Sequence, residues 1–245
     1  MTPHERRAGN GALKAAAGGL ALLALPYAGY VASTWYRYGR TTRPAGGARG
    51  PESSLIDEFM PVAEVAERHE VRIEAPVEDT FAAAREMSLN RSALVRAIFA
   101  ARTLPARLRG RAPGPSSQSL LDETVALGWR VLAERPDREI VVGAVTQPWK
   151  ADVTFRGVDP DAFAAFAEPG YAKIVWTLEA LPLSPTASCF RTQTRVTTTD
   201  PRSRSLFRRY WAVLSPGILL IRRQSLGLVK HEAQRRYRQR LAASE

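Results

Sequence analysis

Cysteine is almost absent from this sequence of 245 residues, because Cys189 is the only one. A single cysteine excludes a disulfide-stabilised scaffold and every metal site that is built on paired cysteines. Phosphate-binding glycine loops, zinc-protease motifs and nucleophile elbows are missing as well. We therefore expect no metal ion, no cofactor and no standard catalytic motif.

Acidic residues are fewer than basic residues, with 24 Asp and Glu against 35 Lys and Arg, so the net charge is +11. The excess is confined to the two ends: residues 1–50 carry +6, residues 51–200 carry −4 and residues 201–245 carry +9. A nucleic-acid-binding domain usually carries its basic surface on the folded domain itself. This distribution argues against nucleic acid as a partner and favours two positive ends beside an anionic membrane.

Charge is also missing from residues 15–35, a run long enough to cross a hydrocarbon layer of about 30 Å. An aromatic belt of Trp35, Tyr36 and Tyr38 at its end, with the cations Arg37 and Arg40, is typical of a membrane interface. We predict a single transmembrane anchor over residues 15–36, after a basic N-terminus at 1–14. A cleaved secretory signal and a buried helix of a soluble domain are the alternatives. The basic C-terminus favours a single-pass membrane protein whose domain faces the cytoplasm.

Glycine, proline, serine and threonine dominate residues 41–54, which predicts a flexible linker over residues 37–60. One folded α+β domain is expected over residues 61–235, followed by a basic tail at 236–245. Hydrophobic periodicity and turn residues predict its elements. Strands are expected at 69–75, 129–134, 139–147, 171–181 and 187–199, and helices at 77–87, 92–102, 160–167 and from 201 onwards, with Pro216-Gly217 kinking or breaking the last helix.

The two longest predicted strands alternate in a way that defines an inward face. Ile174, Trp176 and Leu178 share one side of the first, and Phe190, Thr192 and Thr194 share one side of the second. The opposite sides carry charged residues that can pair across neighbouring strands. We therefore expect these strands to be adjacent, with hydroxyl groups on an otherwise apolar inner face that need partners.

The segment VRIEAPVEDTFAAA (Val71–Ala84) resembles the opening of the START-like superfamily, the helix-grip domains of the SRPBCC group. The shared pattern is a strand that ends in Ala75-Pro76, then acidic residues, then an aromatic residue with alanines on a helix. The segments Phe166–Trp176 and Arg208–Trp211 are similar to an uncharacterised subgroup of it. The resemblance covers roughly residues 67–235 and brings no catalytic motif.

The resemblance implies a curved antiparallel sheet around a long C-terminal helix, enclosing a cavity for a hydrophobic ligand. Combined with the predicted anchor, it favours a membrane-anchored domain that binds a hydrophobic or lipid-like small molecule. A polyketide cyclase/dehydrase-like enzyme, with His69 as its acid–base group, and an interaction module without a ligand are the alternatives. The candidate wall residues are Trp149, Tyr171, Trp176, Phe190, Thr192, Thr194 and Trp211.

Basic residues line much of the C-terminal segment, which also repeats apolar residues on one helical face. A basic amphipathic helix is typical of binding to an anionic membrane surface, and a solvated helix face is the alternative. The candidate membrane-surface residues are Arg222, Arg223, Lys230, Arg235, Arg236 and Arg238.

Overall fold

The structure, a computed structural model, describes residues 26–38, 43–44, 54–88 and 118–244. Most of the predicted anchor, the predicted helix at 92–102 and most of the predicted linker lie outside these residues. Residues 26–37 are helical. The other elements are β1 (Arg43–Pro44), α2 (Ile56–Phe59), β2 (Val62–Ala63), β3 (Val65–Ile73), α3 (Val77–Arg85), α5 (Leu120–Ala126), β4 (Arg130–Arg135), β5 (Glu139–Thr146), β6 (Phe155–Arg156), α6 (Pro160–Phe163), β7 (Ala172–Ser184), β8 (Ala187–Thr198) and α7 (Pro201–Ala242).

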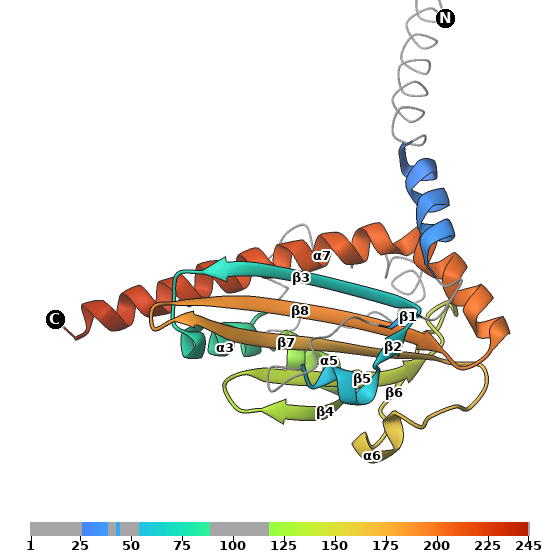
Figure 1. The fold of residues 1–245 in the computed structure, drawn as a ribbon, viewed down its shortest axis with the longest axis horizontal. Coiled ribbons are helices and arrows are strands. Elements are labelled where there is room, and N and C mark those ends of the chain that lie inside the picture. Colours follow the sequence, from blue (N-terminus) through green and yellow to red (C-terminus); the bar gives the residue numbers. More distant parts are fainter. Residues whose placement is uncertain (1–25, 39–42, 45–53, 89–117, 245) are drawn as a thin grey trace, which may run out of the picture.

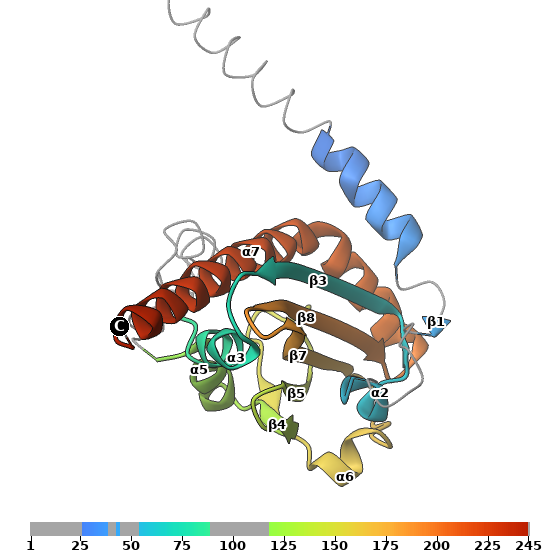
Figure 2. The same ribbon diagram turned by 60° about the vertical axis from the view of Figure 1, so that its left-hand side comes forward.

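A curved antiparallel sheet and one long helix dominate the arrangement (Figure 1). The strand order is β3-β8-β7-β5-β4, and β6 pairs with β5. Helix α7 runs along β3 and β8 on one side of the sheet, while α3 and α5 lie near one end (Figure 2). This is the α+β helix-grip arrangement, so the predicted fold of the domain is confirmed. By length and composition α7 could also cross a membrane, but a helix that packs on a sheet of its own domain is weak support for a span.

The register of β7 and β8 confirms the predicted inner face. Trp176 lies opposite Thr194, and Ile174 lies opposite Val196. On the other face Glu179 lies opposite Arg191, whose Nη1 is 3.4 Å from a Glu179 carboxylate oxygen. This is the cross-strand charge pairing that the alternation predicts.

Asp200 and Pro201 start α7 as the sequence suggests. The Asp200 carboxylate accepts a hydrogen bond of 2.9 Å from the Ser203 backbone N–H, and Pro201 occupies the first turn, where its missing N–H is not needed. The break considered at Pro216 does not occur. Helix α7 is continuous through Pro216 and bends along its first half (Figures 1 and 2).

Contacts with residues 26–37 offset the hydrogen bond that Pro216 cannot make. Proline has no N–H to donate to the preceding turn, so the helical hydrogen-bond ladder is weakened there. In that turn the Tyr27 hydroxyl donates a hydrogen bond of 2.6 Å to the carbonyl of Val213, and the Tyr30 hydroxyl lies 3.0 Å from the Ser215 hydroxyl. Tertiary contacts thus hold the turn of α7 that precedes Pro216.

The folded domain begins before residue 61 and leaves no separate tail after residue 235. Ile56 and Met60 of the predicted linker are buried in a hydrophobic cluster on the outer face of the sheet, away from α7. At the other end, Tyr237 packs against the core, and Arg240 pairs with Asp79 of α3 at 2.5 Å. Composition does not predict that the domain extends at both ends, because a few apolar residues are enough to anchor a short polar segment to the core.

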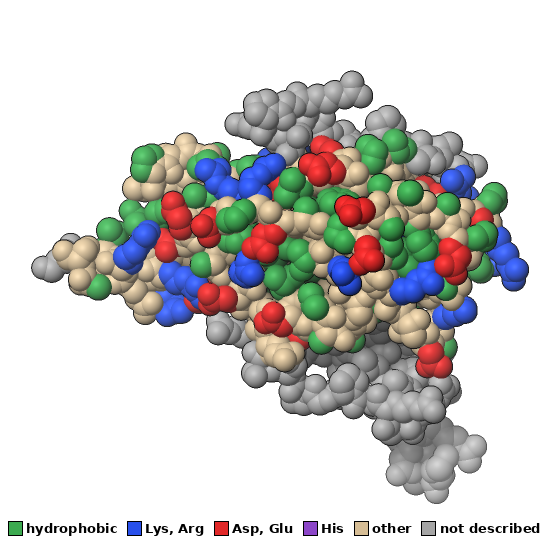
Figure 3. All heavy atoms as spheres, turned by 90° about the horizontal axis from the view of Figure 1, so that it is seen from below, with side chains coloured by type: hydrophobic (Ala, Val, Ile, Leu, Met, Phe, Trp, Pro, Cys, Tyr) green, Lys and Arg blue, Asp and Glu red, His purple; other side chains and the backbone are tan. Residues whose placement is uncertain are grey.

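The outer face of the sheet is buried together with several charges. Arg195 is 2% exposed and pairs with Asp57 beside α2 at 2.6 Å. Glu139 accepts hydrogen bonds from the Ser54 hydroxyl and from the backbone N–H of Leu55. Charged groups therefore fasten the segment that contains α2 to the sheet. Beyond this cluster, the face seen in Figure 3 carries acidic and basic side chains intermixed rather than a field of one sign.

Two buried carboxyl groups on the outer face are cross-strand neighbours. Glu139 of β5 lies directly opposite Glu179 of β7, and both side chains are almost fully buried. Burial first, and then the charge of Glu139, raise the pKa of Glu179 to about 7. The Arg191 guanidinium opposes this shift without cancelling it.

We predict that Glu179 makes the domain less stable as the pH rises from about 4.5 to 7. In that window the folded chain holds a proton that the unfolded chain has released, so the free energy of unfolding falls with rising pH. In Glu179→Gln this loss is absent, and between pH 4 and 8 the wild type loses about 2–3 kcal/mol relative to the variant. Urea unfolding followed by tryptophan fluorescence measures the difference.

The matched control is Glu168→Gln, because Glu168 is an exposed partner of Arg156 at 2.6 Å. An exposed ion pair contributes little to stability, so this variant is expected to follow the wild-type pH profile. Parallel profiles for Glu179→Gln and the wild type would contradict the assignment.

Candidate functional site

The face of the sheet beneath α7 is apolar over the central strand β7 and polar toward the edge strand β3. Rows of side chains cross it from strand to strand, set by the antiparallel register. One row runs from Val142 through Trp176 and Thr194 to Glu67, and the next row ends with His69 opposite Thr192. Polar groups therefore gather where β3 and β8 meet, which is also where α7 lies over the sheet.

Glu67 is held by a tyrosine that follows the helix at 26–37. The Tyr38 hydroxyl donates a hydrogen bond of 2.6 Å to a Glu67 carboxylate oxygen, and the Tyr38 ring meets Trp211 of α7 edge-on at 6.4 Å between centroids. Burial and the hydrogen bond to Glu67 together raise the pKa of Tyr38 to about 12. The hydroxyl is therefore a fixed donor at neutral pH.

Four buried polar atoms on this side of the sheet have no hydrogen-bond partner in the part of the chain that the structure describes. They are His69 Nδ1, Thr194 Oγ1, Trp211 Nε1 and Arg222 Nη1. Buried polar groups are nearly always paired, so each of these is an exception that calls for a partner. Arg222 is partly exposed as a residue, but its unpartnered nitrogen is buried.

Arg222 and His69 are electrostatically coupled. Burial lowers the pKa of Arg222 to about 10, and the charge of Glu67 opposes that shift. Burial is also the main cause that lowers the pKa of His69, and the positive charge of Arg222 lowers it further. His69 is therefore a neutral imidazole at pH 7, beside a buried guanidinium.

Six of the seven predicted wall residues lie on this side of the sheet. Trp176, Phe190, Thr192 and Thr194 share the inner face, and Trp211 of α7 packs in a cluster with Val196 and Phe207. Trp149 packs against that same cluster, and it also lines a pocket of about 410 Å³ beside Gly170 and the start of α7.

Tyr171 lies on the opposite face. Its ring packs against Phe166 at 5.9 Å, and the Arg156 guanidinium lies 4.8 Å from the ring centroid. The reason is parity, because Tyr171 precedes the inward-facing Ala172 by one residue, and successive side chains of a strand point to opposite faces.

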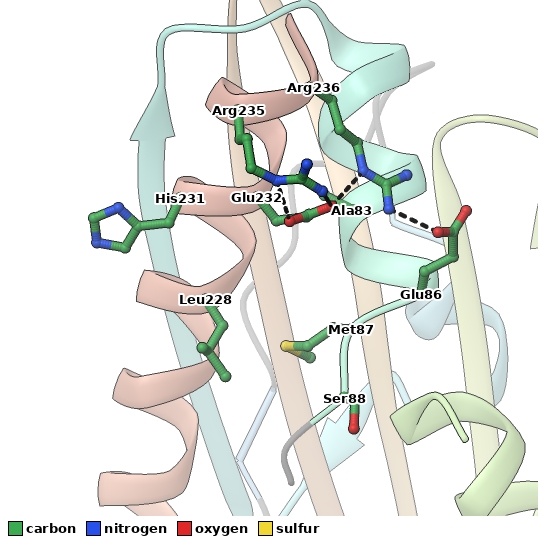
Figure 4. Close-up of a pocket in the computed structure, with 9 residues that line it drawn as sticks. All are labelled: Ala83, Glu86, Met87, Ser88, Leu228, His231, Glu232, Arg235 and Arg236. Atoms are coloured by element: carbon green, nitrogen blue, oxygen red, sulfur yellow. Dashed lines mark hydrogen bonds and ion pairs between the residues drawn. The ribbon is translucent and has the colours of Figure 1, made fainter. Parts of the chain in front are cut away.

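A second pocket, of about 210 Å³, lies between α3 and the C-terminal half of α7 (Figure 4). Met87 and Leu228 form its apolar side. An ionic network closes the other side: Arg236 pairs with Glu86 at 2.7 Å and with Glu232 at 2.8 Å, and Arg235 pairs with the same Glu232 at 2.6 Å. These groups satisfy one another, so the pocket presents no unpaired charge to a ligand.

The predicted membrane-surface residues divide into three groups. Arg235 and Arg236 hold α7 to α3 through the network of Figure 4. Arg222 turns its guanidinium toward the sheet. The remaining three, which form no ion pair within the described part of the chain, are Arg223, Lys230 and Arg238.

Sequence reasoning missed Glu67 and Tyr38 and misplaced Arg222. Glu67 has the parity of His69 on β3, so alternation could have placed it on the inner face. Tyr38 precedes the predicted domain, and the neighbouring Trp35 and Tyr36 led to its assignment to a membrane interface. Arg222 lies in a run of basic residues, where no pattern distinguishes the one that points inward.

Together these features define an α+β helix-grip domain with a polar group of side chains under its helix. No family model matches the sequence, and no curated protein matches it. Three solved structures to which it is similar are a conserved protein from Geobacillus kaustophilus, the ZhuI aromatase/cyclase from Streptomyces sp. R1128 and a START superfamily protein from Mycobacterium smegmatis.

These similarities are distant. The identities are 12%, 15% and 10%, and the TM-scores are 0.34, 0.26 and 0.25, in the same order. The matches cover 70%, 70% and 71% of this chain and 96%, 94% and 97% of the other chains. At such scores they carry no conclusion about a ligand or a reaction.

We predict that Tyr38→Phe destabilises the domain by about 1–2 kcal/mol, because the half-buried Glu67 carboxylate would lose its donor. Urea unfolding of the full chain measures this. Tyr210→Phe is the control, since the Tyr210 hydroxyl makes no hydrogen bond within the described residues. Equal stability of the two variants would show that the hydrogen bond to Glu67 contributes nothing.

Proposed function

We propose that this protein is a membrane-anchored helix-grip domain that binds a hydrophobic or lipid-like small molecule between the inner face of its sheet and α7. The observation that carries the proposal is the set of unpartnered buried polar atoms on His69, Thr194, Trp211 and Arg222. A folded core that served packing alone would carry apolar groups at these positions, because a buried polar atom without a partner costs free energy.

The surroundings of these atoms suit an amphipathic ligand. Trp176 and Phe190 supply apolar surface on the same face, so most of the binding free energy would come from apolar burial. A small number of polar groups inside an apolar site fixes the orientation of a ligand.

Membrane attachment rests on the predicted anchor and on its junction with α7. The helix at 26–37 continues the uncharged run that begins at residue 15. It is fixed to the domain by Tyr27, Tyr30 and Trp35, because the Arg208 Nε–H donates a hydrogen bond of 2.6 Å to the Trp35 carbonyl and the guanidinium lies 3.9 Å from the Trp35 ring centroid.

The surface at this junction is apolar. Val213, Leu214 and Leu220 of α7 are 47%, 43% and 38% exposed, and Tyr27 beside them is 45% exposed. Exposed apolar side chains that adjoin a membrane anchor suit contact with the lipid interface. Arg223 lies on the same helix and adds an exposed positive charge for anionic headgroups.

We predict that the full chain, purified from its own host, carries a co-purifying hydrophobic small molecule in native mass spectrometry. Trp176→Leu is expected to lose most of this adduct, because it removes apolar surface from the inner face. Val175→Ala is the matched control, since Val175 is buried on the outer face one residue away. A wild-type chain that is reproducibly free of any adduct would overturn the binding function.

We predict that Leu214 is shielded by lipid. In a Cys189→Ser background, Leu214→Cys is expected to react at least tenfold more slowly with a membrane-impermeant maleimide in native membranes than in detergent. Ala66→Cys is the control, because Ala66 is exposed on β3, and its rate is expected to be the same in both. Release of the wild-type chain by alkaline extraction, or equal rates for Leu214→Cys, would contradict membrane contact at this surface.

A further inference from the structure

We propose that the ligand is an amphipathic anion, a hydrocarbon-rich molecule whose carboxylate or phosphate group sits against Arg222, with Thr194 and His69 completing its binding. This inference rests on the proposed binding function and goes further, because it assigns the polar end of the ligand and the residues that recognise it. The hydrocarbon part would lie along the apolar inner face that carries Trp176 and Phe190.

The buried guanidinium of Arg222 needs a compensating negative charge. A guanidinium is positively charged at every pH at which the protein functions, and leaving such a charge uncompensated in a buried place is strongly destabilising. Arg222 forms no ion pair within the described part of the chain, and its Nη1 has no hydrogen-bond acceptor there. An anion that enters from outside would supply both.

Glu67 does not supply this compensating charge through an ion pair. Glu67 is close enough to influence Arg222 electrostatically, but it forms no salt bridge with it. Its carboxylate instead accepts the 2.6 Å hydrogen bond from Tyr38. The other polar residues that share this part of the inner face on β3 and β8 are His69, Thr192 and Thr194, none of which carries a negative charge.

Thr194 and His69, which lie near Arg222, can both donate hydrogen bonds to a ligand. Thr194 lies directly opposite Glu67, and His69 is two residues further along the same face of β3, a distance of about 7 Å along the strand. The unpartnered Thr194 hydroxyl can donate, and so can the His69 Nδ1 in the matching tautomer. Together with the guanidinium they form a set of donors, which suits a carboxylate or phosphate and does not suit a second cation.

The test compares dibromostearate with dibromostearyl alcohol as quenchers of tryptophan fluorescence in the full chain held in nonionic micelles. Bromine quenches nearby tryptophan, and Trp176 lies on the binding face. The wild type is expected to bind the acid at least tenfold more tightly than the alcohol, the effect of one charged hydrogen-bonding contact. In Arg222→Met the acid is expected to bind no better than the alcohol.

Arg209→Met is the matched control, because Arg209 is an exposed arginine of the same helix to which no role in binding is assigned, and its loss is expected to leave the preference for the acid intact. Thr194→Val provides a second variant that keeps the shape of the side chain, and it is expected to weaken the acid several-fold and the alcohol not at all. Inorganic phosphate and acetate are titrated separately to distinguish a headgroup from a free anion.

The outcomes separate the two proposals. Equal binding of acid and alcohol by the wild type overturns the anionic headgroup and leaves the proposed function standing. Absence of quenching by both probes overturns both. Displacement of the acid by millimolar phosphate or acetate assigns Arg222 to a free anion and overturns the amphipathic ligand.

Thermal unfolding provides an independent readout. Without ligand, Arg222→Met is expected to raise the melting temperature by about 2–4 °C, because it removes a buried charge that has no partner. The acid is then expected to stabilise the wild type and to have no such effect on the variant. A lower melting temperature for the unliganded variant would mean that Arg222 is a structural residue, and it would overturn the proposal.

Discussion

The antiparallel pairing of β7 with β8 is the constraint on which the rest of the structure depends. Because Trp176 lies opposite Thr194, every side chain of even number along the central part of β7 faces the same side as its even-numbered partner on β8. A shift by one residue would exchange the faces and place Glu179 and Arg195 beneath α7. The register therefore decides both where the core lies and which polar groups are enclosed under the helix.

Alternation made this part of the fold predictable. The sequence pattern assigns Ile174, Trp176 and Leu178 to one face and their charged neighbours to the other, and the structure agrees. The start of α7 was equally readable, since Asp200 and Pro201 act locally. The alternation of the strand and the start of the helix are each determined by residues that are close together in the sequence.

The features that could not be predicted depend on contacts between distant segments. Arg222 looks like its neighbour Arg223, and only the position of α7 over β3 distinguishes them. Tyr38 and Glu67, which form a hydrogen bond, are 29 residues apart in the sequence. The ion pair between Arg236 and Glu86 depends on how α3 packs against α7. Arg235 is held by Glu232 of the same helix. A basic run reads as a solvated or membrane-facing surface until its partners are known.

The contacts between α7 and the helix at 26–37 have a mechanical consequence. Tyr27 and Tyr30 hold the turn of α7 at Val213 and Ser215, only a few turns before Arg222. In the proposed binding mode, a molecule that enters beneath α7 would displace that helix from the sheet, and the displacement would act on residues 26–37 through these two tyrosines. Binding at the proposed site would therefore change the orientation of residues 26–37 relative to the sheet.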